Sequence, residues 1–435
     1  MLLQKSAIAA ACAALAGAAV AQTADSAQPQ TLDTMTVTAN KVEEKLKDVP
    51  QAVTLITGES LKDQGIRNIG DLVREVPNLS STFVYSNDVN FRGINSSTFT
   101  NTNPVVIYVD GVPQSNRLAY DALLENVERI EVLRGPQGSL YGKDAIGGVI
   151  NIITKTPTNT WGGQVGLDVA NQSGRELVFS AHGPLVKDQL FATISGKAAA
   201  DDGWITNHFP GANPNANRSD EQRFNLGLLY KLSGATQLRF NASHDNQNNY
   251  GASGGVVPTG EDYRAYTREM ASQAKFDQTT FTKTQTDAQS LALQHKFATV
   301  TLDAIVTNKA IKMAGDYDID WSSGNPLYDG LNQFQHIKMD TQTEELRLSG
   351  GQAGQTRWVA GLYFEQDKYQ PTRYGMQYPG VAMGMPGVNL DMNAPSTTQS
   401  ETQAVFGQVM VPLSKQWELT LGGRYQHIKK DLALR

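Results

Sequence analysis

The feature that most constrains the fold is an alternation of apolar and polar residues that recurs from about Trp161 onward. In one segment, Val165, Leu167 and Val169 alternate with polar or small residues. About eleven segments of about 8 to 15 residues follow this pattern, which is typical of strands with one apolar face. Because strands joined by tight turns run antiparallel, the sequence predicts a large antiparallel sheet.

The links between these strands alternate between short and long after the second strand. Tight turns are predicted at Gly183–Asp188, Ser233–Gly234, Ala298–Thr299, Gly350–Gln355 and Pro412–Lys415. Long polar loops are predicted at about 201–221, 246–286, 309–340 and 367–402. Tight turns at one end and long loops at the other are typical of outer-membrane barrels, whereas a soluble sandwich has no need of them. We therefore expect residues 158–435 to form antiparallel transmembrane β-barrel strands.

The first residues carry an export signal. Lys5 is followed by an uncharged run from Ser6 to Val20, which ends in small residues. This pattern predicts a signal peptide over residues 1–21, with cleavage before Gln22. A membrane anchor is disfavoured because the run has about 15 residues, against roughly 20 needed to span a bilayer. Lipidation of Cys12 is disfavoured because the apolar run before it is very short.

Two regions separate the signal peptide from the barrel strands. Residues 22–47 are polar and predict a flexible periplasmic arm. Residues 48–157 predict a compact α/β domain with a helix at Asn68–Val76, which Pro77 ends. Strands of this domain are expected at Ala52–Ile56, Val105–Val109, Ile130–Leu133 and Val149–Thr154.

Three motifs give this domain a family resemblance: the NFRGI segment Asn90–Ile94, the IYVDGVP segment Ile107–Pro113, and the run Val127–Pro157. Together they resemble the plug domain of the TonB-dependent outer-membrane transporters, in particular the siderophore receptors. The resemblance implies a plug inside a barrel of about 22 strands. About eleven strands would leave unpaired edges in lipid, so we expect the front portion of a longer transporter, with an incomplete barrel that forms no pore alone.

The run from Val127 to Pro157 also suggests contacts of the plug. Glu131 and Arg134 lie beside a strand end, and the resemblance implies that they form plug–barrel contacts. The alternative is an exposed pair worth about 0–1 kcal/mol. A phosphate-binding loop is disfavoured because Gly138 and Gly142 have the wrong spacing and Asp144 replaces the required Ser or Thr.

The resemblance also implies a ligand site at the apex of the plug. The arginine of the NFRGI motif, Arg92, can face the ligand in the family; bracing of the plug loops is the alternative role. Aromatic and cationic residues that flank the expected apical loops are further candidates: Tyr85, Phe99, Arg117 and Tyr120. Such residues suit an iron chelate or another bulky polar ligand.

The arm contains an island of strand-forming residues that resembles the TonB box: Asp33, Thr34, Met35, Thr36, Val37, Thr38 and Ala39. An exposed extended segment of this kind can add a strand to a partner sheet through main-chain hydrogen bonds. The implied partner is TonB, with its energising complex in the inner membrane. A chance polar strand is the alternative.

Catalytic, metal and nucleic-acid functions find little support. The histidines are scattered, and the net charge of −6 with no basic cluster argues against nucleic acid. Asp316, Asp318 and Asp320 alternate like a calcium loop, but Trp321 and Leu327 replace the required Gly and Glu, so an acidic loop tip is expected. We expect no cofactor and no enzyme activity.

The sequence therefore predicts a protein of the cell outer membrane, in contact with outer-membrane lipid. Its expected function is TonB-dependent active uptake of a bulky ligand, with a ferric siderophore as the leading candidate. Cobalamin, haem and oligosaccharide remain alternative ligands, and a non-transporting surface receptor or adhesin remains an alternative role. A passive porin would need neither the plug nor the arm.

Overall fold

The structure is a computed structural model that describes residues 35–38, 40–42, 44–49, 51–80, 89–95, 103–114, 122, 124–142, 144–251, 262, 264–319, 329–352, 354–414 and 416–434. The expected signal peptide lies outside these residues, and so do Asp33, Thr34, Ala39, Tyr85, Phe99, Arg117 and Tyr120. The chain divides into two units, Met1–Thr36 and Val37–Arg435, and the folded domains belong to the second.

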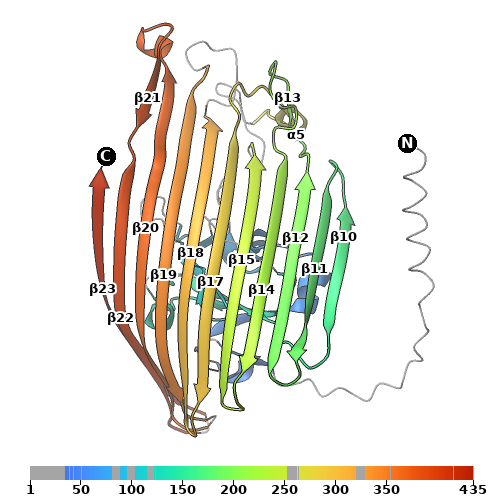
Figure 1. The fold of residues 1–435 in the computed structure, drawn as a ribbon. Coiled ribbons are helices and arrows are strands. Elements are labelled where there is room, and N and C mark those ends of the chain that lie inside the picture. Colours follow the sequence, from blue (N-terminus) through green and yellow to red (C-terminus); the bar gives the residue numbers. More distant parts are fainter. Residues whose placement is uncertain are drawn as a thin grey trace, which may run out of the picture. The chain divides into compact units, whose positions relative to one another are not determined.

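The larger domain is a twelve-stranded sheet, called the wall sheet below. All neighbouring strands are antiparallel, and β21 (Asn389–Asn393) is an extra strand beside β20. The remaining strands follow one another in chain order (Figure 1): β10 (Gly162–Val169), β11 (Arg175–Val186), β12 (Leu190–Asp201), β14 (Ser219–Lys231), β15 (Thr236–Tyr250), β17 (Phe281–Lys296), β18 (Val300–Asp318), β19 (Asn332–Gly350), β20 (Arg357–Pro379), β22 (Ser396–Pro412) and β23 (Glu418–Leu434).

The two faces of the wall sheet differ as the alternation predicts. Leu346 and Leu362 point outward and are 46% and 43% exposed, whereas Val359 and Phe406 point inward and are buried. Figure 1 shows short turns at one end of the sheet and longer links at the other. The described residues contain no helix long and apolar enough to cross a membrane.

The strands are longer than the alternation indicated. β20 has 23 residues, and β18 and β19 have 19 each, so parts of the loops predicted at 309–340 and 367–402 are strand. Asp316 and Asp318 accordingly lie within β18 and not at a loop tip. The apolar alternation ends where the outward face becomes polar, but main-chain pairing needs no apolar face and continues beyond it.

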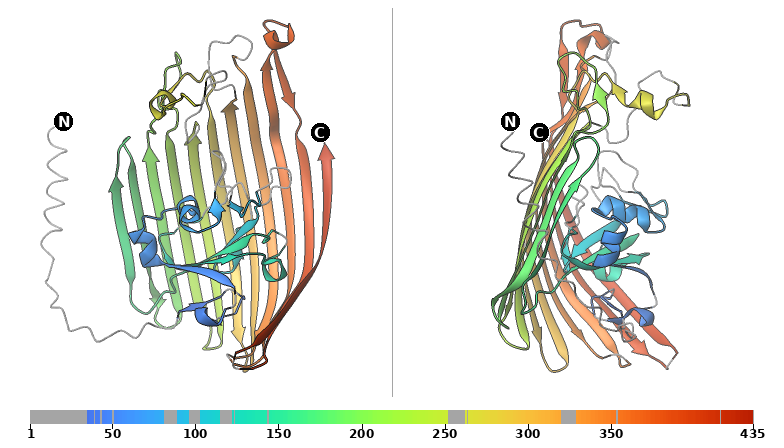
Figure 2. Two further views of the ribbon diagram at one scale, coloured as in Figure 1. Left: turned by 180° about the vertical axis from the view of Figure 1, so that it is seen from behind. Right: turned by 90° about the vertical axis from the view of Figure 1, so that its right-hand side faces the viewer.

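The smaller domain has a five-stranded sheet in the order β3–β8–β9–β6–β7. These strands are β3 (Ala52–Thr57), β8 (Val127–Arg134), β9 (Gly148–Thr154), β6 (Val105–Val109) and β7 (Val112–Pro113). Strands β6 and β9 are parallel, and the other pairs are antiparallel. A separate two-stranded sheet joins β4 (Leu79–Ser80) to β5 (Asn90–Phe91). Figure 2 shows this domain against the concave face of the wall sheet.

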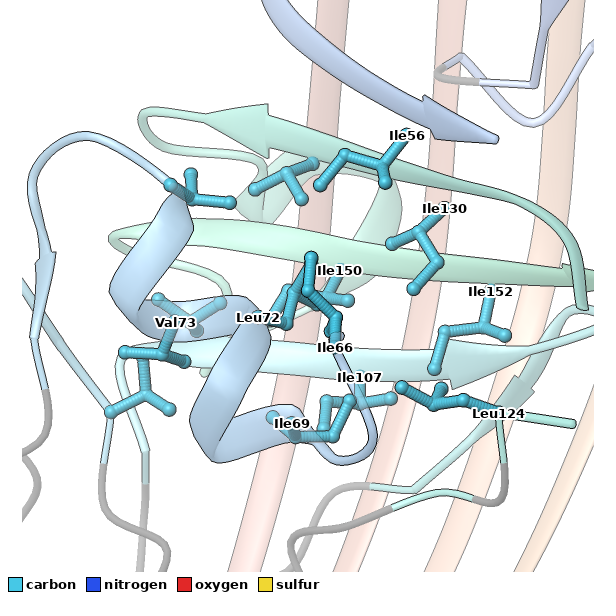
Figure 3. Packing of buried hydrophobic residues seen from close by; sticks show 14 of the residues in the cluster. Ile56, Ile66, Ile69, Leu72, Val73, Ile107, Leu124, Ile130, Ile150 and Ile152 are labelled. Carbon is cyan, nitrogen blue, oxygen red and sulfur yellow. The ribbon is translucent and has the colours of Figure 1, made fainter. Parts of the chain in front are cut away.

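Three short helices complete the smaller domain: α2 (Gly58–Asp63), α3 (Ile69–Glu75) and α4 (Gly138–Tyr141). The side chain of Asn68 caps α3 by accepting a hydrogen bond from the main-chain N–H of Asp71, at 2.9 Å. Ile69 and Leu72 of α3 pack on Ile107 and Ile150 of the sheet (Figure 3), which gives the domain its own apolar core.

Short elements precede the smaller domain and decorate the links of the wall sheet. The first are β1 (Thr36–Val37), β2 (Glu44–Lys45) and η2 (Leu46–Asp48). The links carry β13 (Thr206–Asn207), α5 (Arg268–Ala271), β16 (Gln273–Ala274) and η4 (Gly380–Met383). Parallel pairing of β13 with β16 joins two neighbouring links of the wall sheet.

Candidate functional site

The segment from Val37 to Val49 is packed between the smaller domain and the wall sheet. Val37 is fully buried in an apolar cluster with Tyr108 and Leu133 of the smaller domain and with Val359 and Phe406 of the wall. This packing differs from the flexible arm that composition indicated. The segment has too few apolar residues for a core of its own, but its polar groups find partners on both domains.

Thr38 is held by a buried carboxylate. Its main-chain N–H and its hydroxyl donate hydrogen bonds to Oε2 of Glu131, at 2.9 and 3.0 Å. Nδ2 of Asn151 donates to the Thr38 hydroxyl at 2.8 Å, and Nε of Arg129 donates to Oε1 of Glu131 at 2.9 Å. Glu131 is 0% exposed, so these bonds supply the hydrogen-bonding partners that a buried charge requires.

The predicted role of Glu131 in plug–barrel contact stays a prediction, because its partners above all precede the wall sheet. Arg134 lies at the end of β8, and its buried Nε has no hydrogen-bond partner among the described residues. Both residues lie beside the docked segment, and direct pairing with the wall sheet is made by other side chains.

Lys41 ties the segment to the wall. Its Nζ donates to both carboxylate oxygens of Glu345 on β19, at 2.8 and 2.7 Å. The rings of Tyr108, Tyr141 and Phe406 surround the ammonium group, with centroids 5.6, 5.2 and 5.1 Å from Nζ. Burial lowers the pKa of Lys41 to about 8, although the carboxylate of Glu345 opposes this shift.

A second ion pair lies one turn further along. The guanidinium of Arg357 on β20 donates to Glu44 and also, at 2.6 Å, to Glu418 on β23. Nδ2 of Asn40 donates to Glu44 at 2.6 Å, and Nε2 of Gln408 donates to Asn40 at 3.1 Å. Burial raises the pKa of Glu44. The segment is therefore fixed to the wall at two charged points.

A separate contact joins the plug to the wall on the side of β15. Asp110 and Gly111 form a tight turn with φ of 50° and 82°. The carboxylate of Asp110 accepts hydrogen bonds from the main-chain N–H and the hydroxyl of Thr154, at 3.0 and 2.7 Å. It also pairs with Arg239 of β15 at 3.0 Å. Beside it, Nζ of Lys309 donates to Oε1 of Gln114 at 3.3 Å.

A cavity surrounds this contact, between the smaller domain and strands β12 to β18. The smaller domain contributes Val109–Asp110, Val112–Gln114 and Lys155, together with Asn126 and Thr154. The wall contributes mainly hydroxyl and amide side chains, among them Ser195, Asn225, Asn241, Gln289, Ser290 and Asn308. The cavity can therefore hold a polar molecule or water between the two domains.

Arg92 lies in a tight turn that is closed by reciprocal main-chain hydrogen bonds between Phe91 and Ile94. It is exposed, has a φ of 49°, and its guanidinium lies 5.0 Å from the ring of Phe91. The main-chain N–H of Arg92 donates to Asn78 at 3.2 Å. An exposed cation at a turn is available to a ligand, and ligand contact by Arg92 stays a prediction.

The links on the loop side carry a small core that the sequence did not reveal. Ile205 and Ala216 from one link pack on Ala274 and Phe276 from the next, with Trp204 beside them. Groups of His, Cys, Asp or Glu that could hold a metal ion are absent from the described part of the chain.

The comparisons with known proteins agree with the fold. The TonB-dependent Receptor Plug Domain matches residues 45–149, and the TonB dependent receptor-like beta-barrel matches residues 160–433. The chain therefore belongs to the TonB-dependent receptors, which are proteins of the outer membrane, and the fold predicted from the sequence is confirmed. This is a family of receptors and transporters, not of enzymes.

Three relatives illustrate the range of the family. The pesticin receptor of Yersinia pestis is 33% identical over 184 residues, covering 41% of this chain and 27% of that protein. The iron-regulated outer membrane virulence protein of Vibrio cholerae (strain O395) is 32% identical over 246 residues, covering 52% and 36%. The vitamin B12 transporter BtuB of the same strain is 31% identical over 266 residues, covering 57% and 42%. The chain thus matches less than half of each relative.

Solved structures share the fold at lower identity. The ferric yersiniabactin uptake receptor FyuA of Yersinia pestis superposes with a TM-score of 0.75 at 23% identity, covering 88% of this chain and 57% of that one. The ferripyoverdine receptor of Pseudomonas aeruginosa gives 0.71 at 17% identity, covering 92% and 55%. The chain spans little more than half of either structure.

The sequence interpretation missed Lys41, Glu44, Glu345 and Arg357. A signal was present, because Glu345 and Arg347 stand at the polar positions between the outward-facing Leu346 and Leu348. Charges on the inward side of a lipid-facing strand require partners in the lumen, and a plug that fills the lumen can supply them.

Proposed function

We propose that the protein carries out TonB-dependent active uptake of a bulky ligand, most plausibly a ferric siderophore, across the outer membrane. The docking of Val37 and Thr38 on Glu131 is the observation that carries this proposal. Both residues belong to the proposed TonB box over residues 33–39, and strand addition needs their main chain exposed. In the docked state the Thr38 N–H is bound to Glu131, so TonB would engage the box only after its release.

The coupling follows from the charges. Ligand bound between the plug apex and the outer loops would favour a state in which the segment from Val37 to Val49 leaves its site. Such a shift requires a ligand that binds the released state more tightly than the docked state. The partners in this proposal are TonB with its energising complex, the extracellular ligand, and the lipid around outward residues such as Leu346. Arg92, Tyr85, Phe99, Arg117 and Tyr120 are the proposed ligand contacts.

Iron chelates lead among the ligands because two kinds of likeness point to them. The Vibrio cholerae relative is named as iron-regulated, and FyuA is a ferric yersiniabactin receptor. Likeness to BtuB makes cobalamin the second candidate. Haem, oligosaccharide and a purely adhesive role have no specific observation in their favour. Export with a signal peptide over residues 1–21 completes the proposal.

Growth of the host on single ferric chelates, with and without the gene, tests the ligand. We expect growth on at least one chelate to require the gene and to be lost when residues 33–39 are deleted. A deletion of equal length in the exposed link beside Gly384 serves as a control for insertion and folding. Growth that depends on cobalamin and not on iron would replace the ligand, and uptake that survives the 33–39 deletion would remove TonB from the mechanism.

A further inference from the structure

The plug is joined to the wall sheet in two different ways. On the side of β19 to β22 the interface is apolar, with Tyr108 and Tyr141 packed against Val359, Tyr363 and Phe406. On the side of β14 to β18 the interface is the polar cavity that surrounds Asp110. Among the described residues, two direct contacts cross that cavity: Asp110 to Arg239 and Gln114 to Lys309.

The two sides resist separation to different degrees. Parting the apolar side would expose aromatic and aliphatic surface to water, which is unfavourable in proportion to the area. Parting the polar side would let water replace hydrogen bonds to hydroxyl and amide groups, which costs little. A movement of the plug that opens a path through the lumen would therefore open it first along the polar side.

We propose that the ligand crosses the membrane through the seam between the Asp110–Gly111 turn and strands β14 to β18, which the Asp110–Arg239 and Gln114–Lys309 contacts hold closed. This inference rests on the proposed transport function and specifies the route. The lining of Asn225, Asn241, Gln289, Ser290 and Asn308 offers donors and acceptors to a polar cargo at several points along the path. Such a cargo exchanges one set of hydrogen bonds for another and leaves none of its polar groups unpaired.

The closing contact is built so that it breaks on the wall side. Thr154 holds the Asp110 carboxylate to β9 with two hydrogen bonds, so the turn stays with the plug. Arg239, whose side chain is 27% exposed, keeps access to water when it loses Asp110. The Gln114–Lys309 contact at 3.3 Å is a single hydrogen bond beside it.

The first test measures leakage and needs no ligand. The full-length protein carrying Asp110→Asn or Arg239→Gln is placed in liposomes, and entry of a small polar solute is followed. We expect entry to rise several-fold over the wild type. The control is Asp431→Asn, which removes a wall ion pair that is 61% and 64% exposed and should leave entry unchanged. A leak that follows Glu345→Gln but neither seam variant would place the opening on the other side and overturn the proposal.

The second test uses a cleavable link across the seam. Cys12 is the only cysteine, and it lies in the expected signal peptide, so introduced thiols are labelled selectively. Gln114→Cys and Lys309→Cys are joined by a flexible bifunctional maleimide with an internal disulfide. We expect the linked protein to bind the ferric chelate and not to transport it, with transport restored on reduction. Undiminished transport by the linked protein would overturn the seam, whereas absence of transport by the unlinked protein would count against the proposed function and leave the leakage test to decide the route.

Discussion

The ammonium of Lys41 lies 2.7 Å from a carboxylate oxygen of Glu345, and both side chains are at least 90% buried. This pair joins the segment that precedes the plug to the middle of the wall sheet. A buried pair of this kind adds little net stability, but loss of one partner leaves the other charge uncompensated. The pair therefore acts as a constraint on release of the segment that contains the proposed TonB box.

Glu345→Gln should release the segment. Removing one partner of a buried pair costs about 3–5 kcal/mol, which would shift the docking equilibrium by about two to three orders of magnitude. The measurement is the rate at which a thiol reagent modifies Val37→Cys, whose site is 0% exposed in the docked state. We expect at least tenfold faster modification in the Glu345→Gln background. Asp431→Asn, which breaks an exposed pair, is the matched control, and equal rates in all backgrounds would mean that Lys41 and Glu345 do not control docking.

The glycines of the plug differ sharply in what they tolerate. A Cβ on Gly148 would lie 2.4 Å from the carbonyl oxygen of Leu133 on the paired strand, whereas a Cβ on Gly138 meets nothing within 4 Å. Gly148→Ala should separate β8 from β9 and make the plug sensitive to protease. Gly138→Ala should be neutral or slightly stabilising, because alanine favours the helix α4. The digestion pattern of the full-length protein distinguishes the two, and protection of Gly148→Ala equal to the wild type would contradict the close approach.

The wall sheet was the most predictable part of the molecule. Outward residues such as Leu346 and Leu362 repeat every second position, and that period survives without knowledge of any partner. The plug core was also local in origin, since Asn68 caps a helix whose apolar residues recur at helical spacing. Both predictions rested on patterns within one strand or helix.

The docked segment was less predictable because its partners lie far away in the sequence. Thr38 binds Glu131, 93 positions on, and Lys41 binds Glu345, 304 positions on. A polar stretch without apolar periodicity is consistent with a solvated arm or with a strand held by buried charges. The polar outer halves of β18 to β20 escaped notice for a related reason, since pairing with neighbouring strands leaves no period in the composition.

Glu125 gives the plug a stability that depends on pH. Burial raises the pKa of this carboxyl to about 7, and its Oε2 is buried without a hydrogen-bond partner in the described region. A pKa above the unfolded value near 4.5 means that the contribution of Glu125 is fully favourable below pH 4.5 and is lost as the pH rises to 7. Glu125→Gln should therefore raise the thermal midpoint by a few degrees at pH 8 and by little at pH 4.5. Thermal unfolding of both proteins across this range is the measurement, and a parallel offset at all pH values would contradict the assignment.

Arg357 offers the sharpest separation between charge and geometry. Its two terminal nitrogens contact different carboxylates, Glu44 on the docked segment and Glu418 on β23, and the planar guanidinium suits this fork. Arg357→Lys keeps the charge but has one nitrogen, so it can reach only one of the two carboxylates closely. If the fork holds the segment, Arg357→Lys should release Val37→Cys to the thiol reagent nearly as far as Arg357→Met does. If charge alone matters, Arg357→Lys should stay protected like the wild type. Because Glu44 already has a raised pKa, its protonation at low pH should slow modification in Arg357→Met more than in Arg357→Lys, which retains a cation beside it.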